Sequence, residues 1–352
     1  MAYTTIDDPS AYFQTTLWTG NDTARSITNT GNSDLQPDWV WINNYGSSQN
    51  NRTFDSVRGA GINLVTNSNG AEIDAGTGTD GQLRSFASDG FTIGTDGSVN
   101  NNNEGIVAWQ WKAGTAFSND ASSTSVGSID SAGSVSTAAG FSIITWTGNT
   151  SNETIAHGLG AVPKVIIFKT RAIARDWRTY TETVGNGSYL KLNANTATTS
   201  SSNTFNDTSP TSTVFSVGGS DSTNAGGNMI AYCFADVQGY SKFGSYKGNG
   251  NADGSFVYTG FSPAWLMIKQ TAASNDWFII DNKREPFNPN NVQLVANGTA
   301  ASTNKGDLDL LSNGFKPRSS NAAWNENNAL YIYMAFAEHP FVTSTGIPAT
   351  AR

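Results

Sequence analysis

Short apolar runs that each follow a proline recur three times along the chain. They read PDWVWI at residues 37–42, PKVIIF at 163–168 and PAWLMI at 263–268. Each run is rich in β-branched and aromatic residues, which favour strands, and a proline at the first position of a strand removes no ladder hydrogen bond. The pattern therefore predicts three equivalent buried strands, each entered at a proline.

Other landmarks repeat in the same order around these runs. A Gly-Asn turn precedes each run, at residues 20–21, 148–149 and 248–249. An apolar run closes each unit, at residues 106–111, 230–235 and 332–337. Self-similarity at a fixed spacing indicates a repeat architecture. We expect an all-β protein of three tandem antiparallel β-sandwich or jelly-roll-like repeats, each of about 95–100 residues.

The landmarks also set the expected boundaries. Repeats 1, 2 and 3 are predicted at residues 12–112, 141–236 and 240–339, between an N-terminal arm at 1–11 and a C-terminal tail at 340–352. Residues 113–140 are rich in Gly, Ser and Ala and indicate a linker, or alternatively an extended strap along the surface. The joint between repeats 2 and 3 is so short that we expect these two to pack rigidly, with repeat 1 more independent.

Composition and charge narrow the class of protein. Charged residues make up 14% of the chain, aromatic residues 11%, and the net charge is −8. The aromatic content argues against disorder, and the acidic balance argues against binding nucleic acid through phosphate neutralisation. The sequence has no apolar run of membrane-spanning length and no signal-peptide pattern near Met1, so we expect neither membrane insertion nor export.

Few residues suggest catalysis. The two histidines, His157 and His339, have no counterparts in the other repeats, and no serine or cysteine stands in a nucleophile elbow. Cys233 lies within an apolar run and is expected to be a buried small hydrophobe. Carboxylate pairs such as Asp281 with Glu285 could serve glycoside hydrolysis only if they converged on a sugar. We therefore expect a protein that is not an enzyme.

One loop resembles a calcium site. Asn249, Asn251 and Asp253 place oxygen ligands at positions one, three and five of a loop that has glycine at position six, as in an EF-hand. Position twelve is Gly260, where a bidentate glutamate is required. The sequence therefore indicates no cofactor, with calcium at this loop as a weak alternative.

Tryptophans near predicted turns are the candidates for binding. Trp18, Trp146 and Trp324, the last followed by Asn325, could stack on a sugar ring while amides read its hydroxyl groups. Trp324 has no counterpart in the other repeats, which favours an exposed contact. The alternative is that the tryptophans are core anchors, which is the interpretation we prefer for Trp177 and Trp277, because these two recur together.

The ordered landmarks resemble a known family. The segments HGLGxxPKVIIFK, IAYCFADVQGYSKFGSYKGNG, LSNGF and YIYMAFAEHPF are similar to repeated β-domain structural proteins of tailed bacteriophages, especially marine ones. The resemblance spans residues 12–341 and is strongest over 141–341. It implies a virion location and a tail-fibre or decoration role, sometimes described as lectin-like. No catalytic residue of the family exists to carry over.

The resemblance leaves three functions open. The leading hypothesis is a tail-fibre or receptor-binding component that contacts host-surface polysaccharide. The second is a capsid decoration protein that stabilises the head. This hypothesis ranks close to the first, because the sequence has no heptads that would indicate a fibre stalk. The third is a polysaccharide depolymerase. The expected partners are other virion proteins of the tail or capsid, and the virion context suggests a homo-oligomer, with a trimer as the guess.

Overall fold

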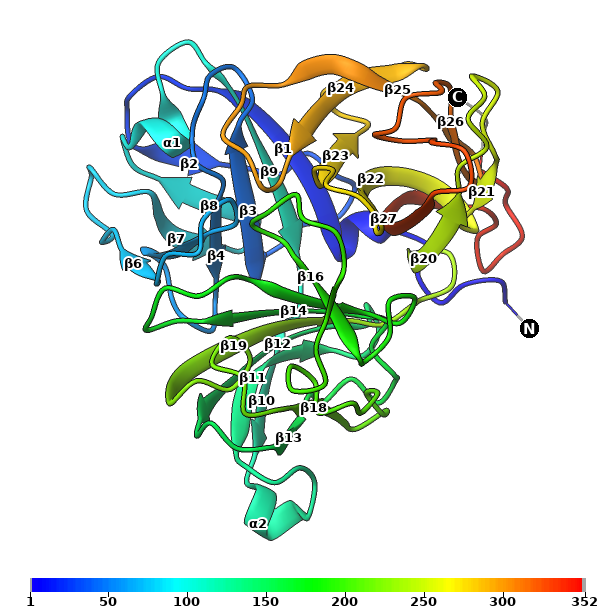
Figure 1. Cartoon of the computed structure of the whole chain (residues 1–352). Helices are drawn as coiled ribbons and strands as arrows, with labels where there is room; N and C mark the ends of the chain where they lie inside the picture. Colours follow the sequence, from blue (N-terminus) through cyan, green and yellow to red (C-terminus); the bar gives the residue numbers. More distant parts are fainter. Residues whose placement is uncertain (1, 350–352) are drawn as a thin grey trace.

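The computed structural model describes residues 2–349, and nearly every element in it is an antiparallel strand (Figure 1). Within this range the two α-helices, α1 (Gly97–Asn100) and α2 (Ala121–Thr124), have four residues each. No helix among the described residues is long and apolar enough to cross a membrane. The all-β class predicted from the sequence is confirmed.

The first group of strands lies in residues 13–111. Its main sheet has the strand order β1 (Phe13–Thr19), β9 (Gly105–Trp111), β3 (Trp39–Asn44), β4 (Arg52–Asp55), β5 (Ile62–Val65) and β6 (Ile73–Asp74). An outer layer of β2 (Arg25–Ile27), β8 (Gly90–Ile93) and β7 (Leu83–Ala87) covers one face of this sheet. The 3-10 helix η1 (Pro9–Ala11) leads into β1.

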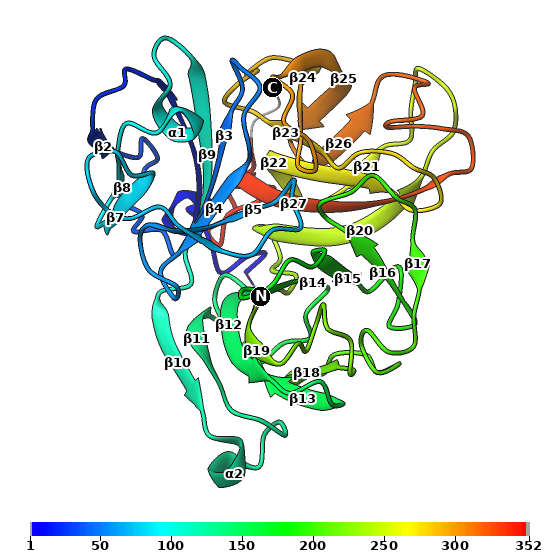
Figure 2. The same cartoon turned by 60° about the vertical axis from the view of Figure 1, so that its left-hand side comes forward.

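The second group has the same plan with one addition. Its main sheet runs β10 (Thr115–Asn119), β11 (Ser131–Ser136), β12 (Phe141–Gly148), β19 (Gly227–Phe234), β14 (Val165–Thr170), β15 (Arg178–Thr181), β16 (Ser188–Lys191) and β17 (Thr199–Ser200). The outer layer is the pair β13 (Glu153–Ala156) and β18 (Val214–Val217). The predicted linker is thus not a free connection, because β10 and β11 extend this sheet as a protruding hairpin with α2 at its tip (Figure 2).

The third group completes the set. Its strands follow the order β20 (Ser241–Lys247), β27 (Leu330–Pro340), β22 (Phe261–Gln270), β23 (Phe278–Asp281), β24 (Asn290–Val295), β25 (Thr303–Leu311), β26 (Gly314–Pro317) and β21 (Val257–Tyr258). The last four strands fold over as the outer layer of a sandwich.

The strand registers are the same in the three groups. Trp39 lies opposite Asp55, Val165 opposite Thr181, and Trp265 opposite Asp281. The same three residues lie opposite Trp111, Phe234 and Phe336 on the other neighbouring strand. These registers define which positions are equivalent among the three groups, which we call repeats 1, 2 and 3.

The proline positions differ from the prediction in detail. Pro37 and Pro163 precede the first residue of their strands by two positions. Pro263 lies inside β22, at a register shift opposite β27. A bulge tolerates a residue without an amide hydrogen, so the proline interrupts the ladder where pairing is already broken.

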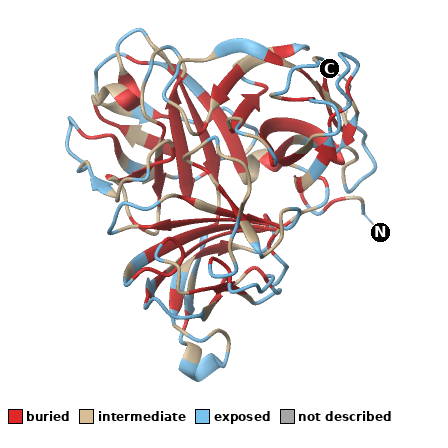
Figure 3. Ribbon diagram, viewed as in Figure 1, coloured by how far each residue is buried: buried red, intermediate tan, exposed pale blue. Residues whose placement is uncertain are grey.

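Each sheet buries both of its faces. The outward faces form three separate cores beneath the outer layers, whereas the inward faces of all three sheets share one central core. Buried residues accordingly concentrate in the middle of the molecule (Figure 3). Trp39 of repeat 1 stacks on Tyr232 of repeat 2 at a ring separation of 4.5 Å, and Trp111 meets Trp265 of repeat 3 at 5.6 Å. The sandwiches therefore form a ring and do not lie in a row.

Equivalent backbone hydrogen bonds close this ring. Glu72 N–H donates to the Arg171 carbonyl, Thr198 N–H to Thr271, and Ser302 N–H to Tyr45, over 2.8, 2.8 and 3.0 Å. Each bond joins one repeat to the next, and the third returns from repeat 3 to repeat 1. Repeat 1 is bonded to both neighbours, so the expectation that it is more independent does not fit the structure.

Side chains reinforce the same junctions. The indole N–H of Trp177 donates to the Val65 carbonyl at 3.0 Å, and that of Trp277 donates to Lys191 at 2.8 Å. At the equivalent place in repeat 1, the Asn51 amide donates to three carbonyl oxygens of repeat 3, each at 3.0 Å. The interpretation of Trp177 and Trp277 as core anchors is confirmed.

Buried ion pairs occupy two of the three junctions. Arg58 Nε donates to Asp55 and Arg284 Nε donates to Asp281, both over 2.6 Å, with all four side chains at most 1% exposed. Tyr232 of repeat 2 donates to Asp55, and Trp109 of repeat 1 donates to Asp281. Each carboxylate thus joins its own repeat to a neighbour.

Replacing Asp281 by Asn should destabilise the whole ring. The substitution leaves the Arg284 guanidinium buried without a counter-charge, which costs on the order of 3–5 kcal/mol. Because the three repeats share one core, urea denaturation followed by tryptophan fluorescence and by circular dichroism should show one common, shifted transition. The exposed Asp253→Asn variant should shift the transition little. Two separate transitions, one of them unmoved in Asp281→Asn, would contradict the shared core.

Candidate functional site

The tryptophans proposed as sugar contacts lie in the interior. Trp18, Trp146 and Trp324 are at most 9% exposed. Their indole N–H groups donate to Val99 O, Asn224 Oδ1 and Lys305 O over 3.1, 3.2 and 3.1 Å. Each ring packs beneath an outer layer of its repeat, and although Trp18 and Trp146 border grooves, at this burial no ring presents an open face for stacking. The prediction that these side chains bind carbohydrate is wrong.

Asn325 is also buried and has a structural role. Its side-chain amide donates to Asn249 Oδ1, Asn251 O and Ser319 O, and its oxygen accepts from Asn249 N–H. Asn100 and Asn224 do the same for the Gly-Asn turns of repeats 1 and 2. These asparagines were not predicted from the repeats, although each lies six or seven residues before the closing apolar run.

The loop compared with a calcium site is held by its own hydrogen bonds. Asn249 Oδ1 accepts from Asn251 N–H, and Asn251 Oδ1 accepts from Asp253 N–H. The Asp253 carboxylate lies 2.6 Å from Lys316 Nζ and 3.2 Å from Arg318, and the hydrogen bond from Lys316 lowers the pKa of Asp253. Two cations beside the only carboxylate disfavour a divalent ion. No group of three or more His, Cys, Asp or Glu residues in 2–349 is arranged to hold a metal.

His157 is a buried neutral side chain. Its Nδ1 accepts a hydrogen bond from Leu159 N–H, so Nε2 carries the proton and donates to the Thr211 carbonyl at 3.1 Å. Burial lowers the pKa of the imidazole to about 4. The ring is stacked on Phe215, with its centroid 6.4 Å away. This geometry fits an ordinary structural histidine.

The other side chains considered for catalysis are paired with cations or buried. Asp281 is bound to Arg284 and Trp109, and Asp309 lies 3.3 Å from Arg318. Burial raises the pKa of the Cys233 thiol, which keeps it protonated. Asp281 and Asp309 are thus engaged by cations and hydrogen bonds, and they are not placed as a pair for acid–base hydrolysis.

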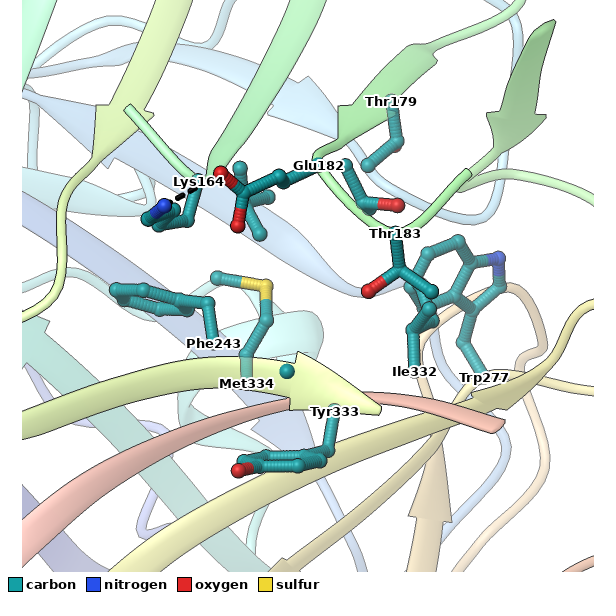
Figure 4. A pocket seen from close by; sticks show the side chains of 12 residues that line it. Lys164, Thr179, Glu182, Thr183, Phe243, Trp277, Ile332, Tyr333 and Met334 are labelled. Carbon is teal, nitrogen blue, oxygen red and sulfur yellow. Dashed lines mark hydrogen bonds and ion pairs between the residues drawn. The ribbon is translucent and has the colours of Figure 1, made fainter. Parts of the chain in front are cut away.

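A cleft between repeats 2 and 3 is too small for a ligand. It lies where repeat 2 has Thr181 in place of the buried aspartate of the other two junctions, and where repeat 3 has Met334 in place of the aromatic donor to that aspartate. Lys164 and Glu182 pair at its mouth, above Phe243 and Met334 (Figure 4). The cleft offers about 10 Å³ to water-sized molecules, which is room for roughly one water.

Exposed aromatic side chains occur together on the outer layer of repeat 3. Phe256, Tyr258 and Phe287 are 46%, 54% and 76% exposed, and they are the exposed large aromatics of the described residues. Tyr258 lies opposite Gly314, and a Cβ atom at Gly314 would come within 2.9 Å of the Phe256 ring. The glycine therefore leaves room for the Phe256 ring to lie flat on β26.

Phe287 lies at the same end of this layer, beside β25. The next residue, Asn288, donates its side-chain amide to Leu310 O at 2.8 Å and accepts from Leu310 N–H at 3.0 Å. Leu310 lies opposite Phe315, one row from Tyr258. Phe287 therefore lies in the loop next to β25, and β26 separates β25 from β21, which carries Tyr258. We call Phe256, Tyr258 and Phe287 the aromatic face.

Polar groups border the aromatic face. Tyr258 Oη lies 3.0 Å from Tyr3 Oη, which donates to the Gly260 carbonyl at 2.7 Å. A network of ion pairs joins Lys316 of β26 and Asp309 of β25 with Arg318 and Asp253. Flat apolar surface beside hydrogen-bonding groups is the usual composition of a sugar-contact surface.

The aromatic face has no equivalent in the other repeats. Ile27, Ile155 and Val257 lie opposite Phe91, Phe215 and Phe315, which fixes the alignment of the outer layers. At the positions of Phe256 and Tyr258, repeat 1 has Ser26 and Thr28, and repeat 2 has Thr154 and Ala156. The sequence could have revealed this difference had the outer layers been aligned.

Comparison with known proteins places the complete ring in one family. A family model described as a domain of unknown function, DUF7483, matches residues 8–340. The chain belongs to the DUF7483 family. The match includes all three repeats, so the DUF7483 unit is the whole ring and not one sandwich. No curated protein and no solved structure matches the chain.

The stability of this DUF7483 protein should depend on pH through His157. The unfolded chain binds a proton near the ordinary pKa of 6.5, whereas the folded protein does so near 4. The free energy of unfolding should therefore fall between pH 6.5 and 4, by about 3 kcal/mol from this group. Urea titrations over this range should show a smaller fall in His157→Gln. An equal fall in the variant would assign the pH dependence to other groups.

Proposed function

We propose that this chain is a non-enzymatic structural protein on the surface of a tailed-phage virion. In this proposal it is a tail-fibre or receptor-binding component that contacts host-surface glycans. The resemblance of residues 12–341 to phage β-domain proteins gives the virion context. The aromatic face is the observation that carries the glycan contact.

Three features of the aromatic face support recognition. Its side chains stay exposed although the same chain buries all of its tryptophans. The residues equivalent to Phe256 and Tyr258 in the other two repeats are small, so the fold does not require these two rings. The aromatic face extends from β21 across β26 and β25 to the loop before β24, which suits an extended oligosaccharide better than a compact ligand.

In this proposal the ring of three sandwiches holds the aromatic face rigidly. Three sandwiches around one core supply, within a single chain, the threefold arrangement that a homotrimer would supply with three chains. Such a unit could sit on a threefold site of a tail or capsid, with the two termini on the repeat 3 side (Figure 1). Its partners in the proposal are other virion proteins and host-surface polysaccharide.

Removing aromatic rings should weaken glycan binding without unfolding the protein. Phe256→Ala, Tyr258→Ala and Phe287→Ala should each reduce affinity by about threefold to tenfold, since a stacked ring contributes roughly 0.5–1.5 kcal/mol. The affinity would be measured by calorimetry on polysaccharides selected from an array of bacterial surface glycans. Ile73→Ala and Ile173→Ala, on exposed side chains of repeats 1 and 2, serve as controls. Unchanged binding in all three aromatic variants would refute this site.

A capsid decoration role is the second candidate, because residues 2–349 contain no stalk. Cryo-EM of intact particles distinguishes the two roles by position and copy number. Density at the tail supports the receptor-binding proposal, and density over the head lattice would replace it with the decoration role. Release of reducing ends from a bound polysaccharide would overturn both in favour of a depolymerase.

A further inference from the structure

The edge of β1 is open, whereas the equivalent edge in repeat 2 carries an added strand. β1 ends the strand order of its sheet, but β12 is flanked by β11 on the corresponding side. In repeat 2, Ala132 lies opposite Thr145 and Ser134 opposite Ile143. The positions equivalent to Thr145 and Ile143 in repeat 1 are Leu17 and Thr15.

The backbone groups at this edge point away from the sheet. Gly20 N–H donates to the Glu104 carbonyl and Lys112 N–H donates to Tyr12, so the even-numbered residues of β1 are bonded to β9. The N–H and C=O groups of Thr15 and Leu17 therefore face the open side. Among residues 2–349 no strand pairs with them. Such an edge is a template for another strand.

A groove runs beside this edge between repeats 1 and 3. It offers about 380 Å³ to water-sized molecules along Leu17, Trp18, Arg25 and Lys283. A deeper recess of about 60 Å³ continues from it, past Thr15, to Asn282. The groove is thus long enough for a chain that lies along β1.

Several buried polar atoms at the groove have no partner. Neither the nitrogen nor the oxygen of the Asn282 side-chain amide is hydrogen-bonded, although this residue is only 2% exposed. Thr15 Oγ1 and Arg25 Nε are unpaired as well. A buried donor or acceptor without a partner is costly. A peptide group, which donates and accepts side by side, is the complement of the Asn282 amide.

The charged side chains of the groove predict the charge of its occupant. Arg25 and Lys283 line the groove, and neither forms an ion pair within the described part of the chain. Glu338 lies only at the recess end. A carboxylate side chain near Arg25 would therefore be attracted.

We propose that β1 is the acceptor of an extended segment of a partner protein, made of small residues and carrying a carboxylate. The segment adds to β1 as an antiparallel strand, as β11 adds to β12. The model for this segment is β11, with the sequence SAGSVS, in which a small residue is required at Gly133 because a Cβ atom there would lie 1.8 Å from the Ile143 carbonyl oxygen. This proposal does not depend on the glycan contact of repeat 3.

The first test uses a synthetic peptide of residues 130–137, with the sequence DSAGSVST. Hydrogen exchange of the full chain should slow across residues 13–19 when the peptide is added, and calorimetry gives the affinity. Methylating the peptide nitrogens of Ala132 and Ser134, which face the acceptor strand, should weaken binding more than tenfold. Methylating those of Gly133 and Val135, which face away, should change it less than threefold. Equal effects of the two methylation patterns would overturn strand addition.

The second test changes the protein. Leu17→Pro removes an outward N–H that takes no part in the β9 ladder, and it should weaken peptide binding more than tenfold. Ser245→Pro, at the equivalent position of β20, is the matched control and should bind as the unchanged chain does. Arg25→Ala should weaken the DSAGSVST peptide severalfold but not its Asp130→Asn form. No binding at all, or loss of binding in Ser245→Pro alone, would overturn the proposal.

Light scattering of the purified chain identifies a competing occupant. A monomer in both the unchanged protein and Leu17→Pro supports a foreign partner. An oligomer that Leu17→Pro dissociates would mean that a second copy covers β1, and the partner proposal would fall.

Discussion

The structure depends on one central core that three sheets share. Each main sheet presents an apolar face to this core and another to its own outer layer, so its strands are apolar on both sides. A sheet of this kind cannot be left with one face in water, because the exposed apolar area would be large. The three repeats are therefore obligatory partners, and a family unit that includes all three follows from the packing.

Polar contacts give this apolar core a specific arrangement. Hydrophobic packing alone tolerates sliding of one sheet over another, but a buried donor must meet its acceptor. Lys169 and Lys269 each direct a buried ammonium group at three backbone carbonyls, one of them in the preceding repeat. Burial lowers the pKa of both to about 8, and the charges of Asp176 and Asp276 oppose part of this shift. Repeat 1 has Asn43 at the equivalent position, and its junction uses amide hydrogen bonds instead.

The sequence predicted the strands better than their assembly. Runs such as VIIF and WVWI are apolar at consecutive positions, which is typical of strands buried on both faces. That signal favours a shared core over a row of separate sandwiches, but it is local and does not say which surface covers each face. β11 was missed for a different reason: its small residues lack strand propensity, and pairing with β12 stabilises it. Trp324 was misplaced because a residue beside a turn can still direct its ring inward.

Departures from the repeat pattern are more informative here than the pattern itself. Positions that are alike in all three repeats, such as the turn-holding asparagines, serve the fold. Tyr258 replaces a threonine and an alanine found at the equivalent positions, and no contact of the core requires it. In repeat 2 the departure is the added strand β11, whereas the equivalent edges, β1 of repeat 1 and β20 of repeat 3, end their sheets. The fold neither requires nor covers the aromatic face of repeat 3 and the free edge of β1. An external partner would therefore gain most by binding these two surfaces.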